Sequence, residues 1–107
     1  MGFSHLYLGW RRVNSFRTVH PLEADLNYVT VARLSEVPSG QTLWVKPTRH
    51  DRLVLCNVGG AIYAIADACT HEGGMLRFGK LDGQQMECPR HGARFDVSTG
   101  EVVTPPA

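Results

Sequence analysis

The sequence contains two short segments, Cys69-Thr70-His71-Glu72-Gly73-Gly74 and Cys88-Pro89-Arg90-His91, each with one thiol and one imidazole. Residues 72–87 lie between the first histidine and the second cysteine. Thiolates and imidazoles are good ligands for zinc, copper and iron. A structural zinc site usually takes a pair of cysteines from one loop and a pair of histidines or cysteines from the other. The alternating order instead predicts two converging loops, the first arm (residues 69–71) and the second arm (residues 88–91), each donating one ligand of each kind.

The residues around the arms carry a specific resemblance. The first arm with Glu72-Gly73-Gly74, and the second arm with Gly92-Ala93-Arg94-Phe95-Asp96, closely resemble the cluster loops of Rieske-type ferredoxins. The resemblance runs from about Tyr28 to the last residue. In a Rieske centre, two cysteines hold one iron of a [2Fe–2S] cluster and two histidines hold the other. The resemblance therefore implies one such cluster per chain, with four metal ligands: Cys69, His71, Cys88 and His91.

The same resemblance implies a function. It indicates a one-electron carrier that takes electrons from a flavin- or NAD(P)H-dependent reductase and passes them to a terminal oxygenase or a similar acceptor. Small subunits of nitrite reductases look similar, and a Cys2His2 zinc module with a structural or interaction role is a further alternative.

The chain is not expected to be an enzyme, and no catalytic residue is assigned. A cysteine nucleophile would need only one Cys–His pair, whereas two matched pairs point to a metal. A mononuclear oxygenase iron needs two histidines and a carboxylate. The spare histidines, His5, His20 and His50, lie outside any such motif.

Size and charge limit the partners. A chain of 107 residues supports one small domain. No stretch approaches the roughly 18 to 20 apolar residues needed to cross a membrane. Residues 1–22 hold three arginines and no acid, so the rest of the chain carries eight basic and ten acidic side chains. Because nucleic-acid binding calls for a clustered basic face, we expect neither a nucleic acid nor a membrane as partner.

The third cysteine, Cys56, lies in the apolar run Leu53-Val54-Leu55-Cys56 and is expected to be a buried structural thiol. An odd number of cysteines with metal-like spacing argues against a secreted disulfide scaffold. It favours a reducing compartment, and we expect the cytoplasm.

The pattern of the chain predicts an all-β fold of antiparallel sheets with the two arms at one tip. Strand-like runs are expected at 28–32 and 42–46, and the runs 53–58 and 61–66 flank the hairpin signal Gly59-Gly60. Further short hairpins are expected around Asp82-Gly83 and around Ser98-Thr99-Gly100. No segment shows sustained helical periodicity.

One domain boundary is expected, after residue 27. Residues 1–27 read as an N-terminal extension that is disordered or follows a start codon assigned too far upstream, and residues 28–107 as the Rieske domain. Related ferredoxins continue past Thr104 with strands that return to the base sheet, so this domain is expected to lack its last C-terminal strands and to expose a sheet edge.

Several single side chains carry expectations of their own. Trp44 and Phe95 are expected in the core, and His50 in an exposed turn. The arginines near the arms are expected to be solvated surface charges, with contact to an acidic partner as the alternative: Arg77, Arg90 and Arg94. High-potential Rieske proteins carry a disulfide that joins the two loops and two hydroxyl groups that face the cluster. By the resemblance, Gly74 and Arg90 occupy the positions of the disulfide cysteines here, and Ala93 and Phe95 those of the hydroxyl side chains. None of these four residues can form the disulfide or donate a hydroxyl hydrogen bond.

Overall fold

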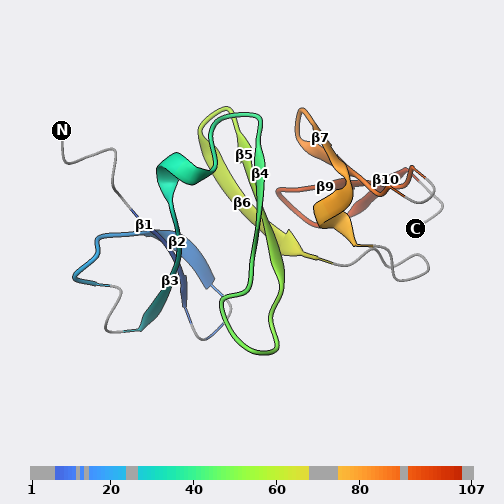
Figure 1. Ribbon diagram of the computed structural model, residues 1–107. Coiled ribbons are helices and arrows are strands. Elements are labelled where there is room, and N and C mark those ends of the chain that lie inside the picture. The colour runs from blue at the N-terminus through green and yellow to red at the C-terminus, as the bar shows by residue number, and fades with distance from the viewer. Residues whose placement is uncertain are drawn as a thin grey trace.

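The computed structural model describes residues 7–11, 13, 15–23, 27–67, 75–89 and 92–104, and these residues form an all-β fold (Figure 1). The all-β prediction is confirmed: apart from two single turns of 3-10 helix, η2 (Leu34–Glu36) and η3 (Leu76–Phe78), every regular element in these ranges is a strand. The strands are β1 (Tyr7–Arg11), β2 (Ser15–Val19), β3 (Tyr28–Arg33), β4 (Thr42–Val45), β5 (Leu53–Val58), β6 (Ala61–Ala66), β7 (Lys80–Asp82), β8 (Gln85–Glu87), β9 (Arg94–Asp96) and β10 (Val102–Thr104).

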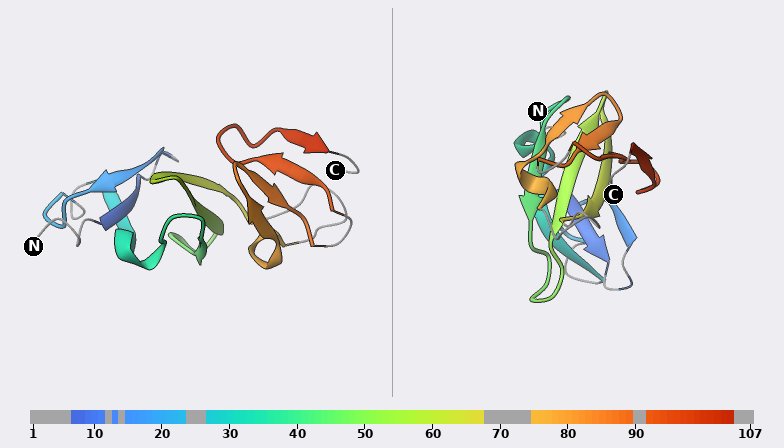
Figure 2. Two further views of the ribbon diagram at one scale, coloured as in Figure 1. Left: turned by 90° about the horizontal axis from the view of Figure 1, so that it is seen from above. Right: turned by 90° about the vertical axis from the view of Figure 1, so that its right-hand side faces the viewer.

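The strands make three small antiparallel sheets. Their orders are β2-β1-β3, β4-β5-β6 and β10-β9-β8-β7. The sheet of β4, β5 and β6 lies between the other two, which occupy opposite ends of the molecule (Figure 2). No helix in the described residues is long and apolar enough to cross a membrane.

The β5–β6 hairpin forms where the sequence predicts it. Its two-residue turn, Gly59-Gly60, has φ angles of 59° and 99°, a left-handed conformation that only glycine adopts without strain. The turn is also held by Asn57, whose Oδ1 accepts the N–H of Gly60 at 2.8 Å while its Nδ2 donates to the Val37 carbonyl at 2.8 Å. A buried polar side chain with both ends satisfied fixes the hairpin against the loop before β4.

The continuous apolar run of β5 is explained by two hydrophobic cores, one on each face of the strand. Side chains alternate between the faces of a strand. Leu53 and Leu55 pack into the core shared with β1 and β3, whereas Val54 and Cys56 pack into the core shared with β8 and β9. Because both faces are covered, β5 has no polar alternation and joins the two halves of the molecule.

The N-terminal prediction is wrong for the residues that the structure describes. Residues expected to be disordered form β1 and β2, and β1 pairs with both β2 and β3. Leu8, Trp10 and Val19 are 0%, 7% and 1% exposed, and Leu8 and Trp10 pack into the core shared with β3 and β5. The basic composition of these residues suggested a disordered extension. A few large apolar side chains at alternating positions are nevertheless enough for the segment to pack as part of the sheet. Residues 1–6 and 24–26 lie outside the described part.

Two further expectations need correction. The β7–β8 turn falls at Gly83-Gln84, one residue later than expected, with Gly83 at a φ of 60°. Trp44, expected in the core, is 40% exposed, because alternation along β4 buries Val45 and turns Trp44 outward. Phe95 is buried and His50 exposed, as expected.

Candidate metal centre

Of the four predicted ligands, only Cys88 lies within the described residues. Cys69, His71 and His91 fall in the segments 68–74 and 90–91, which are outside them. What the structure does describe is where each arm leaves and rejoins the fold. The first arm connects Asp67, directly after β6, with Met75, directly before η3. The second arm begins directly after β8 and returns to β9.

The ends of both arms converge on one hydrophobic core. Ile65 before the first arm, Leu76 after it, Cys88 at the start of the second arm and Ala93 after it are all buried in the same cluster of side chains. These residues are far apart in the sequence, and only the antiparallel packing of β5, β6, β8 and β9 brings them together. The packing therefore brings the described ends of both arms together, as the ligand pattern requires.

The second arm is closed by its own backbone. The N–H of Cys88 donates to the Ala93 carbonyl at 2.7 Å, and the N–H of Gly92 donates to the Cys88 carbonyl at 3.1 Å. Gly92 has a φ of 76°, and a Cβ added there would meet no atom within 4 Å. Glycine is thus needed at this position for the turn itself and not for a close contact with another described residue.

Cys88 is held in place by the fold at the start of the second arm. Its side chain is 1% exposed and packs among apolar neighbours, and its thiol is free. It differs from the equally buried Cys56 in its position on an arm, where the sequence pattern predicts a ligand.

The other described cysteine, Cys56, behaves as expected of a structural thiol. It is fully buried on β5, and burial raises its pKa to about 12. It therefore stays neutral at physiological pH and is not a thiolate ligand in this structure.

The buried carboxylate of Asp67 links the two ends of the first arm. Asp67 Oδ1 accepts the backbone N–H of Arg77 at 2.9 Å, and Asp67 Oδ2 lies 3.3 Å from Arg77 Nε. The Asp67 side chain is 1% exposed and that of Arg77 is 22% exposed. The Nε–Oδ2 approach is within ion-pair distance but is too poorly aligned for a hydrogen bond. The stronger of the two interactions is therefore the hydrogen bond from the Arg77 backbone N–H to Asp67. We call the hydrogen bond and the ion pair together the Asp67–Arg77 clamp.

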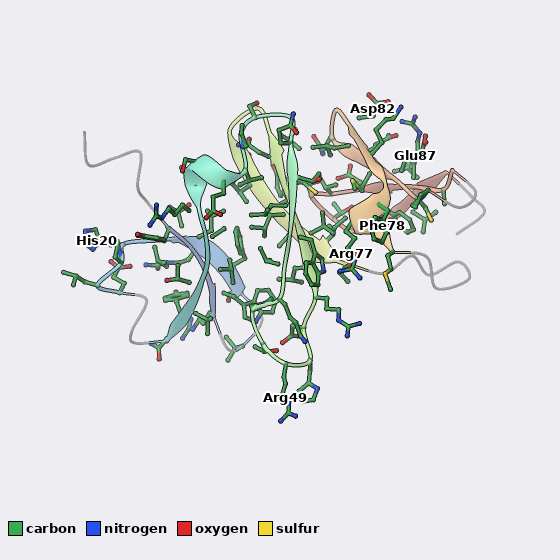
Figure 3. The ribbon with its side chains drawn as sticks, in the orientation of Figure 1. His20, Arg49, Arg77, Phe78, Asp82 and Glu87 are labelled. Carbon is green, nitrogen blue, oxygen red and sulfur yellow. The ribbon has the colours of Figure 1, made fainter. Side chains whose placement is uncertain are left out.

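Arg77 also makes contacts that the sequence did not predict. Its guanidinium carbon lies 4.3 Å from the ring centroid of Trp44 and 5.2 Å from that of Phe78, and Nη2 approaches the Met75 sulfur at 2.9 Å. Figure 3 shows Arg77 and Phe78 together at η3. The expectation of a freely solvated arginine is wrong, because the aromatic rings and Asp67 fix the side chain.

Gly79 ties η3 to the strand that leads into the second arm. A Cβ at this position would lie 2.1 Å from the backbone oxygen of Glu87, directly before Cys88. The φ angle of Gly79 is −82°, so the constraint is steric and not conformational. This close approach was missed in the sequence, where Gly79 has no turn partner to mark it.

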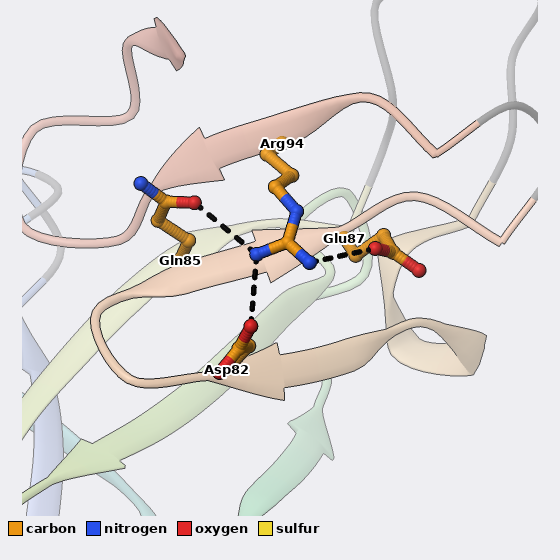
Figure 4. A network of polar contacts seen from close by, with 4 residues as sticks. All are labelled: Asp82, Gln85, Glu87 and Arg94. Carbon is orange, nitrogen blue, oxygen red and sulfur yellow. Dashed lines mark hydrogen bonds and ion pairs between the residues drawn. The ribbon is translucent and has the colours of Figure 1, made fainter. Parts of the chain in front are cut away.

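Arg94 cross-links the three strands around the second arm (Figure 4). Its Nη1 donates to Asp82 on β7 at 2.9 Å and to Gln85 on β8 at 3.3 Å, and its Nη2 donates to Glu87 at 3.1 Å. The hydrogen bond to Asp82 is the largest of the effects that raise the pKa of Arg94. Arg94 was expected to be a solvated charge, but its charge is neutralised by two carboxylates. Arg90 lies outside the described residues.

The two arms together offer two thiols and two imidazoles, the ligand types of a Rieske-type cluster. The described ends of both arms pack into one core. Within the described ranges, no three histidine, cysteine, aspartate or glutamate side chains gather into another candidate metal site.

Comparisons with known proteins agree with this assignment. The profile of the Rieske [2Fe-2S] domain matches residues 27–107. The ferredoxin component of naphthalene 1,2-dioxygenase/salicylate 5-hydroxylase systems from a Ralstonia species is 38% identical over 80 residues, covering 75% of this chain and 76% of that protein.

Solved structures agree as well. The Sphingomonas yanoikuyae B1 ferredoxin has a TM-score of 0.68 at 32% identity, covering 72% of this chain and 76% of that one. A chain in the complex of reduced oxygenase and oxidised ferredoxin of carbazole 1,9a-dioxygenase has a TM-score of 0.67 at 37% identity, covering 71% of this chain and 70% of that one.

Proposed function

Because this chain belongs to the Rieske [2Fe-2S] domain family, we propose that its cluster is bound by four side chains: Cys69, His71, Cys88 and His91. The cofactor is one [2Fe–2S] cluster, which supplies reversible one-electron chemistry when bound. The protein is therefore an electron carrier and not itself a catalyst. The ligand assignment gives the two cysteines to one iron, as thiolates, and the two histidines to the other, as neutral imidazoles.

The observation that carries the ligand assignment is the shared core beneath the arms. Ile65, Leu76, Cys88 and Ala93 anchor all four ends of the two arms in one packed cluster. A rigid base fixes the ends of each arm before the metal binds, which lowers the ordering cost of binding. The Asp67–Arg77 clamp restrains the first arm, and the backbone bonds between Cys88, Gly92 and Ala93 restrain the second.

The partners follow from the relatives. The similar Ralstonia protein is a component of dioxygenase systems, and a similar chain was solved in a complex with a reduced oxygenase. By analogy, this carrier takes electrons from a flavin- or NAD(P)H-dependent reductase and gives them to a terminal ring-hydroxylating oxygenase. These relatives favour the oxygenase assignment over that of a nitrite reductase subunit.

A cytoplasmic location is supported by cysteine chemistry. Cys56 and Cys88 are both free in the described residues, and neither is within a disulfide. Free thiols that serve as a core side chain and a metal ligand are suited to a reducing compartment.

Metal analysis tests the cluster directly. Protein purified without oxygen damage is expected to be red-brown, with about two irons and two acid-labile sulfides per chain. Stoichiometric zinc in a colourless, natively produced sample would overturn the assignment.

Ligand variants test the four residues. Cys69→Ala and Cys88→Ala are each expected to abolish cluster assembly, whereas Cys56→Ala is expected to keep the visible spectrum, because its thiol is buried on β5. If Cys56→Ala folds but loses the cluster, the thiols have been assigned wrongly.

A further inference from the structure

A group of exposed apolar and aromatic side chains surrounds Arg77. Trp44 and Met75 are each 40% exposed and Phe78 is 70% exposed, although all three are large hydrophobic residues. Arg77 contacts each of them, so the four side chains form one continuous surface, which we call the Arg77 patch. Aromatic residues, methionine and arginine are the residue types enriched in protein interfaces. The composition of the patch therefore indicates a protein-binding surface.

A basic loop borders the Arg77 patch. The connection between β4 and β5 carries exposed Lys46, Arg49, His50 and Arg52. Its one acid, Asp51, is engaged within the loop by Thr48. Figure 3 shows Arg49 at the tip of this loop. Within the described part of the chain, the three cations of the loop form no ion pair.

The patch and the loop meet at Asp67. A polar groove of about 400 Å³ is lined by Arg49, His50, Arg52, Ala66 and Asp67. Asp67 also pairs with Arg77, so one residue contacts both the groove and the patch. Asp67 and Met75 are the two residues between which the first arm runs, so this surface lies where the first arm leaves and rejoins the fold.

The charge on this surface differs from that at the other arginine near the arms. Arg94 is neutralised by Asp82 and Glu87, and these acids lie on the third sheet, away from Arg49 (Figure 3). The basic loop keeps its positive charge in a chain whose body beyond residue 22 is net acidic. Such a local reversal of sign gives a direction to the protein's electrostatic field.

From these observations we infer that the Arg77 patch and the basic loop form the docking surface for an acidic surface of the protein's redox partner. The inference rests on the proposed electron-carrier function and adds the partner's chemistry. The basic loop steers the acidic partner, which raises the rate of encounter. The Arg77 patch then supplies a small apolar contact, which suits a short-lived complex at the low end of interface sizes. Docking here would bring the partner to Asp67 and Met75, the described residues on either side of the first arm.

Gold electrodes coated with defined monolayers test the basic loop without an identified partner. The protein is cluster-loaded, and the probe is a carboxylate-terminated monolayer at low ionic strength. Arg49→Glu and Arg52→Glu are each expected to lower the electron-transfer rate about tenfold relative to the unmodified protein. Arg11→Glu makes the same change of charge at an exposed position on β1, in a different sheet from the loop, and is expected to leave the rate unchanged. At a hydroxyl-terminated monolayer, all four proteins should transfer electrons equally fast.

A mixed monolayer of carboxylate and methyl groups tests the Arg77 patch. Phe78→Ser is expected to slow electron transfer at the mixed monolayer and not at the pure carboxylate one. Leu22→Ser removes an apolar side chain of similar exposure, 77%, from the turn after β2 and serves as the matched control. It is expected to have no effect on either surface.

The results separate this inference from the proposed function. Iron and sulfide are measured on every sample, and an unmodified protein without them would refute the proposed function. With the cluster present, equal slowing by Arg11→Glu and Arg49→Glu would show that only net charge matters and would overturn the docking surface. An unchanged electron-transfer rate for Phe78→Ser at the mixed monolayer would show that the Arg77 patch is not part of the docking surface.

Discussion

Replacing Asp67 with alanine tests whether the Asp67–Arg77 clamp holds the first arm. The carboxylate accepts the backbone N–H of Arg77 at 2.9 Å, and its side chain is only 1% exposed. A charge-assisted hydrogen bond of this kind contributes about 1.5 to 3 kcal/mol. The ion pair with Arg77 Nε, at 3.3 Å and poorly aligned, adds about 0.5 kcal/mol because the arginine is partly solvated. Asp67→Ala is therefore expected to cost about 2 to 3 kcal/mol of folding free energy.

Thermal unfolding of the cluster-loaded protein, followed without oxygen by the visible absorption of the cluster, measures this cost. For a domain of this size, the expected loss corresponds to a fall in Tm of about 8 to 12 °C. Asp67→Asn keeps an oxygen that can accept the backbone N–H, so it is expected to lose about half as much. The cluster should also be released faster at constant temperature, because the ends of its first arm are no longer linked.

Asp82→Ala is the matched control, since it too removes a carboxylate from an arginine. Asp82 lies 2.9 Å from Arg94, but its side chain is 63% exposed. A solvent-exposed ion pair contributes about 0 to 1 kcal/mol. If Asp67→Ala lowers Tm no more than Asp82→Ala, the clamp has no special role and the reasoning from burial fails.

Three further predictions follow from other parts of the structure. Gly79→Ala should destabilise the protein by more than about 3 kcal/mol in urea unfolding, because its Cβ would lie 2.1 Å from the Glu87 backbone oxygen; a loss below about 1 kcal/mol, the effect of an ordinary substitution, would contradict this contact. Burial raises the pKa of Cys56 from 9.0 to about 12, so the unfolded chain ionises first and stability should fall between about pH 9 and pH 12; Cys56→Ala should reduce that fall, and an identical alkaline profile would argue against burial as its cause. The midpoint potential should lie around −150 to −100 mV, near the low end of the Rieske range, because the buried Ala93 and Phe95 offer no hydroxyl to the cluster; voltammetry should show a higher potential for Ala93→Ser, and a midpoint above about +100 mV in the unmodified protein would contradict the assignment.

The sequence by itself determined the features that depend on neighbouring residues. The β5–β6 hairpin follows from Gly59-Gly60, whose positive φ angles are a local property of the backbone. The prediction of a [2Fe–2S] site follows from the alternating order of cysteines and histidines, which can be read from the sequence without knowledge of the fold. The role of Cys56 follows from its apolar run, since a strand buried on both faces needs no polar alternation.

Only the tertiary structure decided which distant residues meet. The local pattern of residues 7–19 was too weak to place them in the sheet with β3, because the stabilisation of Leu8 and Trp10 comes from β3 and β5. Trp44 was expected in the core because of its size, but the register of β4 turned it outward. The Asp67–Arg77 clamp and the contact of Gly79 with Glu87 both cross between elements. Long-range packing energy of this kind depends on three-dimensional neighbours, which a pattern along the chain does not contain.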